Sequence, residues 1–291
     1  MLKVVDYVIT TTELLANKIR MFNNNVVVIP NALNSEGQFK PNPTTSDRIR
    51  FGIIGGISHY TDINLLEGVV NQLPSEILNK SQFVLCGFDK SYTKDLQQRE
   101  KIDWKNNKWN HLEQILTNNY KTISPQHLQK LKEYNYGVEF SFDEPYKRMW
   151  AKDVLNYAKF YDEIDVLLVP LYKTNFNECK SELKMIEASV KRKATIISDV
   201  FPYKYCGINA IEKGGSINYN GNCLMIPQNK GSKGWCKAII RLVNDNNLRN
   251  LIQTNISKLT EVGGKYNLTE VTKTRKAFYT TILKKENETE K

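Results

Sequence analysis

Residues Asp165–Ser198, DVLLVPLYKTNFNECKSELKMIEASVKRKATIIS, carry the pattern that decides the fold. The stretch opens with the apolar run Asp165–Leu171, continues with helical periodicity over Lys180–Lys191, and closes with a β-branched run at Ala194–Ser198. A continuous apolar run is typical of a strand buried on both faces of a parallel sheet. The stretch therefore predicts a strand, a helix and a second strand of one parallel sheet.

The alternation continues on both sides of this stretch. We expect strands at Ile49–Ile54, Gln82–Cys86 and Leu224–Ile226, a helix over Asp62–Leu73, and helices from Trp235 to Leu283. This order predicts the α/β class with a doubly wound parallel sheet. Such sheets bind ligands at the carboxyl ends of their strands, beside the point where the strand order reverses. Functional residues should therefore follow directly after strands.

The remaining segments have weaker patterns. At the N-terminus we expect a strand at Val4–Thr10, a helix from Thr12 to Phe22, a strand at Val26–Ile29 and the proline-containing linker Asn34–Asp47. Further helices are expected at residues 111–118, 125–133 and 153–161, and residues 137–142 are a candidate strand.

The composition excludes several classes of protein. The 291 residues are 41% hydrophobic, which is enough for a packed core, and no window is apolar over the 18 residues that a membrane span needs. The short apolar run at the N-terminus contains Asp6 and is not a signal peptide. The scattered five Cys and three His residues match no zinc or disulfide pattern, so we expect no metal and a cytoplasmic location. The net charge of +10 is spread along the chain without a basic run, so nucleic acid is not an expected partner.

Two glycines follow the expected strand Ile49–Ile54. In GIIGGISHYTD, Gly55 and Gly56 stand between a strand and a helix. Glycines let a backbone approach an anion, and a helix N-terminus favours negative charge. The motif lacks the full spacing of a dinucleotide fingerprint or a P-loop. A tight strand-to-helix turn explains the same residues, and both interpretations stay open.

The second motif is FNECKSELKMIEAS, which follows the apolar strand. On one continuous helix, Lys180, Lys184 and Glu187 would share a face, and the Ser181 hydroxyl would lie near the first turn. Two cations, a hydroxyl and free backbone N–H groups suit a phosphate, and the carboxylate would suit ribose hydroxyls. A solvated helix face with paired Lys and Glu is the alternative.

The order of these motifs resembles the C-terminal, donor-binding portion of a GT-B glycosyltransferase of the retaining, glycogen-synthase-like type. The resemblance is carried by VDYVITTTELLANKI, VVVIPNALN and IRFGIIGGISHYTDINLL, and above all by FYDEIDVLLVPL with the FNECKSELKMIEASVKRKATIISDVFPY that follows it. That last pair is similar to a pattern of bacterial and phage glycosyltransferase-like proteins. It implies a Rossmann-like sheet and transfer of a sugar from a nucleoside-diphosphate sugar to a hydroxyl acceptor, without metal or other cofactor.

The resemblance also implies roles for particular residues. Lys180 and Ser181 match the segment that faces the diphosphate, Gly55 and Gly56 match the loop against the phosphates, and Glu187 matches the glutamate that holds the ribose. The full set implied for donor binding is Gly55, Gly56, His59, Asp62, Lys180, Ser181, Lys184 and Glu187, with Lys180 and Glu187 as the catalytic pair.

The chain departs from the family pattern in two places. Cys179 stands where a first glutamate of the sugar-binding motif would be, and only about thirty residues precede the linker, where a full GT-B enzyme has a further domain. We expect residues 1–34 to be a remnant of the acceptor domain with the interdomain linker, residues 35–285 to bind the donor, and residues 286–291 to be a charged tail.

Two hypotheses follow from the resemblance. In the first, the chain is the donor-binding half of a glycosyltransferase, with a nucleotide sugar, a carbohydrate or lipid-linked acceptor, and a separate N-terminal domain or chain as partners. Its location would be cytoplasmic, with contact to the inner membrane surface as a further option. In the second, the chain is a non-catalytic nucleotide-sugar-binding or structural module, which the departures at Cys179 and the N-terminus would favour.

Overall fold

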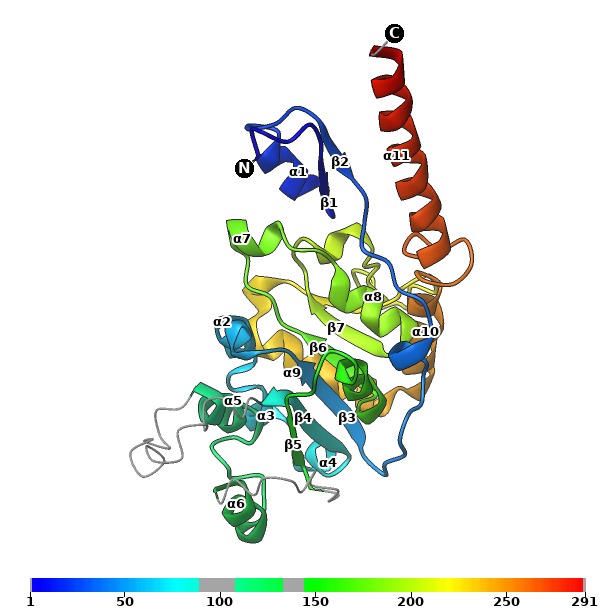
Figure 1. Cartoon of the computed structure of the whole chain (residues 1–291). Coiled ribbons are helices and arrows are strands. Elements are labelled where there is room, and N and C mark those ends of the chain that lie inside the picture. Colours follow the sequence, from blue (N-terminus) through cyan, green and yellow to red (C-terminus); the bar gives the residue numbers. More distant parts are fainter. Residues whose placement is uncertain (1, 89–107, 133–143, 290–291) are drawn as a thin grey trace, which may run out of the picture.

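The computed structural model describes residues 2–88, 108–132 and 144–289. Its centre is a six-stranded, all-parallel sheet in the order β5-β4-β3-β6-β7-β8 (Figure 1). The strands are β3 Ile49–Ile54, β4 Ser81–Phe88, β5 Tyr146–Trp150, β6 Val166–Val169, β7 Ala194–Ser198 and β8 Leu224–Ile226. The predicted doubly wound α/β sheet is confirmed.

The strand order reverses between β3 and β6. From β3 the chain moves outward through β4 to β5, and it then returns to place β6 on the other side of β3, with Phe51 paired to Val166. The carboxyl ends of β3 and β6 therefore lie side by side and form the switch point where sheets of this kind bind ligands.

The two faces of the sheet carry separate cores because side chains alternate along each strand. On one face, Phe51, Ile53 and Leu168 pack with helices α3 Val69–Gln72, α5 Lys108–Leu116 and α9 Gly231–Asn244. On the other, Ile54 and Leu167 pack with α8 Leu183–Val190 and the 3₁₀ segment Tyr157–Glu163. Between β3 and Ser257 the described residues also form the helices α2 Tyr60–Ile63, α4 Ser75–Asn79, α6 Pro125–Lys132, α7 Asn175–Glu178 and α10 Asn246–Ser257.

The first residues form a unit outside this sheet. Strands β1 Val8–Thr10 and β2 Val26–Val28 pair in parallel as a two-stranded sheet, connected by helix α1 Glu13–Ile19. Figure 1 shows this β1–α1–β2 unit over the α7 side of the main sheet, next to the long helix α11 Leu268–Thr289. The rings of Tyr7 and Phe278 pack edge to face at 5.7 Å between centroids and join the unit to α11.

Several sequence predictions need correction. The helix expected over residues 62–73 is broken at Gly68, whose φ of +76° separates α3 from the turns before it. The helix expected at 153–161 begins only at Tyr157 and is a 3₁₀ helix that ends at Glu163. Strand β5 was not predicted, and the candidate strand at 137–142 lies outside the described residues. The helix expected from Lys180 begins only at Leu183, and α11 continues to Thr289 instead of ending near Leu283.

No described helix has the length and apolarity to cross a bilayer.

Candidate functional site

The predicted site residues lie at the switch point, on the segments that leave β3 and β6. Gly55 and Gly56 follow β3 directly, and the chain then turns through His59 into α2, which carries Asp62. After β6 the chain passes Tyr172, forms the short helix α7, and reaches Lys180 before α8 begins. Side chains from the two segments meet at Asp62.

Asp62 is a buried carboxylate, 4% exposed, that joins the two segments. Its Oδ1 accepts hydrogen bonds from the backbone N–H of Tyr172 at 2.9 Å and from Asn177 Nδ2 at 3.0 Å. Its Oδ2 lies 3.2 Å from His59 Nδ1 and 3.9 Å from Lys180 Nζ. Burial alone would raise the pKa of Asp62, but the hydrogen bonds from His59 and Tyr172 and the charge of Lys180 outweigh it and lower the pKa. Asp62 is therefore ionised at neutral pH.

His59 lies on the glycine loop. A Cβ atom added to Gly55 would come within 2.9 Å of His59 Cδ2 and 3.7 Å of Nε2, so glycine is needed for the ring to lie there. Nδ1 faces Asp62, whereas Nε2 has no hydrogen-bond partner among the described residues. The side chain is 35% exposed. The ring thus presents Nε2 at the carboxyl end of β3.

A second carboxylate, Glu187 on α8, lies in a different set of contacts. Its Oε2 accepts hydrogen bonds from Tyr161 at 2.5 Å, Tyr157 at 3.0 Å and Lys184 at 3.1 Å, and Lys184 also contacts the Tyr157 hydroxyl. Burial would lower the pKa of Lys184, but the charge of Glu187 and the hydrogen bonds with Tyr157 and Glu187 outweigh it and raise the pKa. Burial raises the pKa of Tyr161 well above its usual value. Oε1 takes part in none of these bonds.

The structure thus divides seven of the eight predicted residues into two clusters, and the eighth, Ser181, contacts Asn31 instead. We call Gly55, Gly56, His59, Asp62 and Lys180 the Asp62 cluster, and Lys184 and Glu187 with their tyrosine partners the Glu187 cluster. The prediction that Lys180 shares a helix face with Lys184 and Glu187 is wrong. A separate short helix, α7, begins at Asn175, because Thr174 Oγ1 accepts a hydrogen bond from the N–H of Asn177 at 3.0 Å. It ends at Glu178, so Lys180 lies in the connection between α7 and α8.

Ser181 contacts the N-terminal part of the chain. Its hydroxyl oxygen accepts a hydrogen bond from Asn31 Nδ2 at 2.9 Å. Nearby, Thr12 Oγ1 donates to the Cys179 carbonyl at 3.4 Å. Because the Ser181 oxygen accepts from Asn31, its own hydrogen is free to donate elsewhere. Sequence reasoning missed Asn31, since the Pro-Asn pair that contains it is also a common turn.

Sequence reasoning missed other partners as well. Asn177 carries no recognisable signal, and the helical spacing of Tyr157 and Tyr161 is typical of core residues. The ring of Tyr161 is fully buried, as expected of a core residue, but its hydroxyl binds Glu187. The described residues contain no group of three His, Cys, Asp or Glu side chains that could hold a metal ion.

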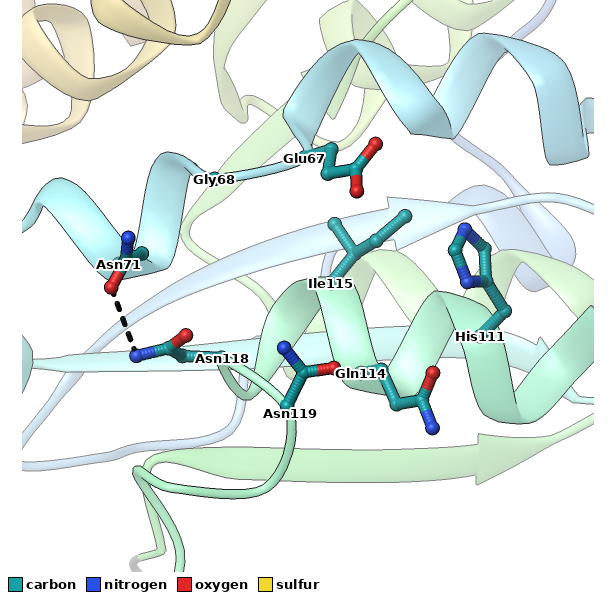
Figure 2. Close-up of a pocket in the computed structure, with 8 residues that line it drawn as sticks. All are labelled: Glu67, Gly68, Asn71, His111, Gln114, Ile115, Asn118 and Asn119. Carbon is teal, nitrogen blue, oxygen red and sulfur yellow. Dashed lines mark hydrogen bonds between the residues drawn. The ribbon is translucent and has the colours of Figure 1, made fainter. Parts of the chain in front are cut away.

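A hollow of about 220 Å³ lies between the start of α3 and α5 (Figure 2). Asn118 Nδ2 donates to Asn71 Oδ1 across it at 3.2 Å. None of the predicted site residues is among those that line it, which are Glu67, Gly68, Asn71, His111, Gln114, Ile115, Asn118 and Asn119.

Comparison with known proteins supports the fold. No family model and no curated protein sequence matches the chain. Among solved structures, it is similar to sucrose-phosphate synthase from Thermosynechococcus elongatus, with a TM-score of 0.62 and 16% identity over 97% of this chain and 59% of that one. It is also similar to HepE from Anabaena in complex with UDP and glucose, with a TM-score of 0.60 and 10% identity over 95% and 63% of the two chains.

A third neighbour is a glycosyltransferase from Rickettsia africae, with a TM-score of 0.59 and 13% identity over 96% and 64% of the two chains. The fold is that of a Rossmann-like GT-B domain. The chain spans about three-fifths of the length of these neighbours.

Proposed function

We propose that the chain binds a nucleoside-diphosphate sugar at the switch point and takes part in transfer of the sugar to a hydroxyl acceptor. The observation that carries the proposal is the Asp62 cluster. Lys180 and His59 lie on the segments after β6 and β3, at the place where a doubly wound sheet binds its ligand. The neighbour HepE was solved with UDP and glucose, which supports the same ligand class.

In sugar transfer, negative charge develops on the diphosphate leaving group. When the bond between the anomeric carbon and the diphosphate oxygen breaks, both electrons of that bond stay with the diphosphate. Lys180, the Ser181 hydroxyl and the backbone at Gly55 and Gly56 would hold this charge, which is electrostatic catalysis by groups already in place. No metal is needed in this scheme. The acceptor hydroxyl supplies the other electron pair, and its proton leaves to solvent or a base.

Glu187 is proposed to hold the ribose. All three of its described hydrogen bonds end on Oε2, so Oε1 keeps its capacity to accept from a ribose hydroxyl. Lys184 would act indirectly in this scheme, because its ammonium group is directed to Glu187 and Tyr157. We assign residues 35–285 to donor binding and residues 1–34 to the acceptor side and the linker.

Thermal denaturation with UDP, GDP, ADP and CDP, each against its own nucleoside, tests the proposal. A ligand at about 100 times its dissociation constant stabilises a fold by about 2.7 kcal/mol, which gives a clear rise in Tm. We expect one diphosphate to stabilise the chain and Lys180→Ala to remove most of the shift. Lys80→Ala is the matched control, because Lys80 precedes β4 at the opposite end of the sheet.

A null result with all four diphosphates would contradict the proposal. Where a diphosphate binds, radiolabelled nucleotide sugar with carbohydrate acceptors tests transfer. Binding without any transfer or hydrolysis would leave a binding module as the function.

A further inference from the structure

We propose that Asp62 positions His59 and Lys180 as two cations that face one phosphate, so that the nucleoside diphosphate binds together with a proton on His59. This inference rests on the proposed function and deepens it. It assigns Asp62 the part of a positioning residue and His59 that of a proton-dependent ligand.

Asp62 itself is unsuited to contact a phosphate. It is an ionised, buried carboxylate, and a second anion beside it would be repelled. Its Oδ1 is occupied by Tyr172 and Asn177, and its Oδ2 faces the two cationic side chains. Lys180 is 31% exposed and His59 35%, so both can reach a ligand beyond the carboxylate.

The contact between His59 and Asp62 determines where the ring carries its hydrogens. An ionised carboxylate only accepts hydrogen bonds, so Nδ1 must hold a hydrogen when it faces Oδ2. In the neutral ring, Nε2 then presents a lone pair, which repels a phosphate oxygen. In the imidazolium both nitrogens carry hydrogens, and Nε2–H can donate to the phosphate. Binding at Nε2 therefore requires the protonated ring.

The charges around His59 set the sign of the pH dependence. Asp62 on α2 favours the imidazolium, and Lys180, from the connection after α7, opposes it. Tyr203 also lies near Asp62, but burial raises its pKa and keeps it neutral. A bound diphosphate adds at least two negative charges beside the ring and favours the imidazolium further. Binding is therefore strongest at low pH and weakens as pH rises and the ring loses its proton.

The test is the affinity for the diphosphate, measured by calorimetry between pH 5.5 and 8.5. The probe is whichever of UDP, GDP, ADP and CDP gives the largest thermal shift. The phosphate itself titrates near pH 6, but this contribution is shared by the wild type and His59→Gln, so their difference isolates the ring. We expect the ratio of wild-type to His59→Gln affinity to fall by up to about tenfold per pH unit and to level off at high pH.

Two further variants separate a positioning role from a merely structural one. In Asp62→Asn, an amide N–H can donate to Nδ1, which leaves the hydrogen of a neutral ring on Nε2. We expect this variant to bind the diphosphate with the His59-dependent pH slope removed. His111→Gln is the control for the loss of a histidine. The His111 ring lies on α5 and packs on the ring of Tyr60 at 5.3 Å between centroids, so this variant should retain the wild-type pH profile.

The outcomes distinguish the inference from the proposed function. Equal pH profiles for the wild type and His59→Gln, with a diphosphate clearly bound, would overturn the inference alone. Failure of all four diphosphates to bind the wild type at every pH would overturn both. Circular dichroism and Tm of each variant show whether a loss of binding comes from unfolding. If Asp62→Asn does not fold, the His59→Gln comparison still decides the matter.

Discussion

Asp62 and Glu187 are both 4% exposed carboxylates with a lysine beside them, yet their surroundings differ. Asp62 is held by backbone and amide groups, and its cations remain about one-third exposed. Glu187 is held by two tyrosine hydroxyls and by Lys184, which also contacts Tyr157. The two carboxylates would therefore serve a ligand in different ways. Asp62 would act through the donors of its partly exposed cationic partners, and Glu187 would act through its own Oε1.

The largest expected effect is on folding stability, at Glu187. Glu187→Ala would leave the hydroxyl of Tyr161 and the ammonium of Lys184 without their acceptor, and breaking a buried ion pair costs about 3–5 kcal/mol. Since Lys184 keeps 21% exposure, we expect about 3 kcal/mol, measured by urea denaturation. Glu187→Gln keeps an acceptor and should lose less than half as much. Equal losses would show that the hydrogen bonds contribute little.

Lys180→Ala should instead have a small effect on folding stability and a large effect on diphosphate binding. Its Nζ is 3.9 Å from Asp62 and partly exposed, so stability should change by less than about 1 kcal/mol. A charge-assisted contact with a phosphate is worth about 1.5–3 kcal/mol, so affinity for the diphosphate should fall about 10- to 100-fold. Affinity for the free nucleoside should not change. Equal losses for nucleoside and diphosphate, measured by calorimetry, would remove Lys180 from the phosphate position.

Gly55→Ala should act through His59. The new methyl group would lie 2.9 Å from His59 Cδ2 and displace the ring from Asp62. We expect roughly tenfold weaker diphosphate binding, with no further loss when His59→Gln is added. Additive losses in this double-mutant cycle would mean that the methyl group disturbs the loop itself.

The smallest expected effect is at Asn31. Asn31→Ala removes the donor to Ser181 and frees the hydroxyl to rotate, which should weaken diphosphate binding a few-fold, in line with about 0.5–1.5 kcal/mol for one hydrogen bond. In a Ser181→Ala background the same change should have no effect on affinity. Asn34→Ala, three residues further along the linker, serves as the control.

The sequence pattern predicted the sheet well where strands are apolar and end at Gly or Pro. Strands β3 and β8, which are followed by Gly55 and Pro227, have the predicted bounds for this reason. Strand β7 also has the predicted bounds, although Asp199 follows it. Strand β5, with sequence YKRMW, was missed because it contains two cations. Arg148 within it is 1% exposed and pairs with Glu113 at 2.6 Å, a tertiary contact that no local pattern encodes.

The sequence predicted the position of the candidate site but not the contacts within it. Strand ends placed His59, Asp62 and Lys180 at one edge of the sheet, and the structure confirms that they meet there. Their separation from Glu187 depends on where α7 ends and α8 begins. These boundaries are set by capping residues such as Thr174, which helical periodicity in the sequence does not reveal.

The hydrogen bond between Asn31 and Ser181 has a thermodynamic consequence. Thr12 also donates to the Cys179 carbonyl, and the Leu14 N–H donates to the Tyr205 hydroxyl. Through these three bonds, the orientation of the Ser181 hydroxyl depends on the position of the β1–α1–β2 unit. Coupling of this kind is reciprocal. If the position of the unit changes the affinity for a phosphate at Ser181, a bound phosphate must change the equilibrium between positions of the unit by the same factor. A ligand that does not contact the first thirty residues would then still change their position relative to the main sheet.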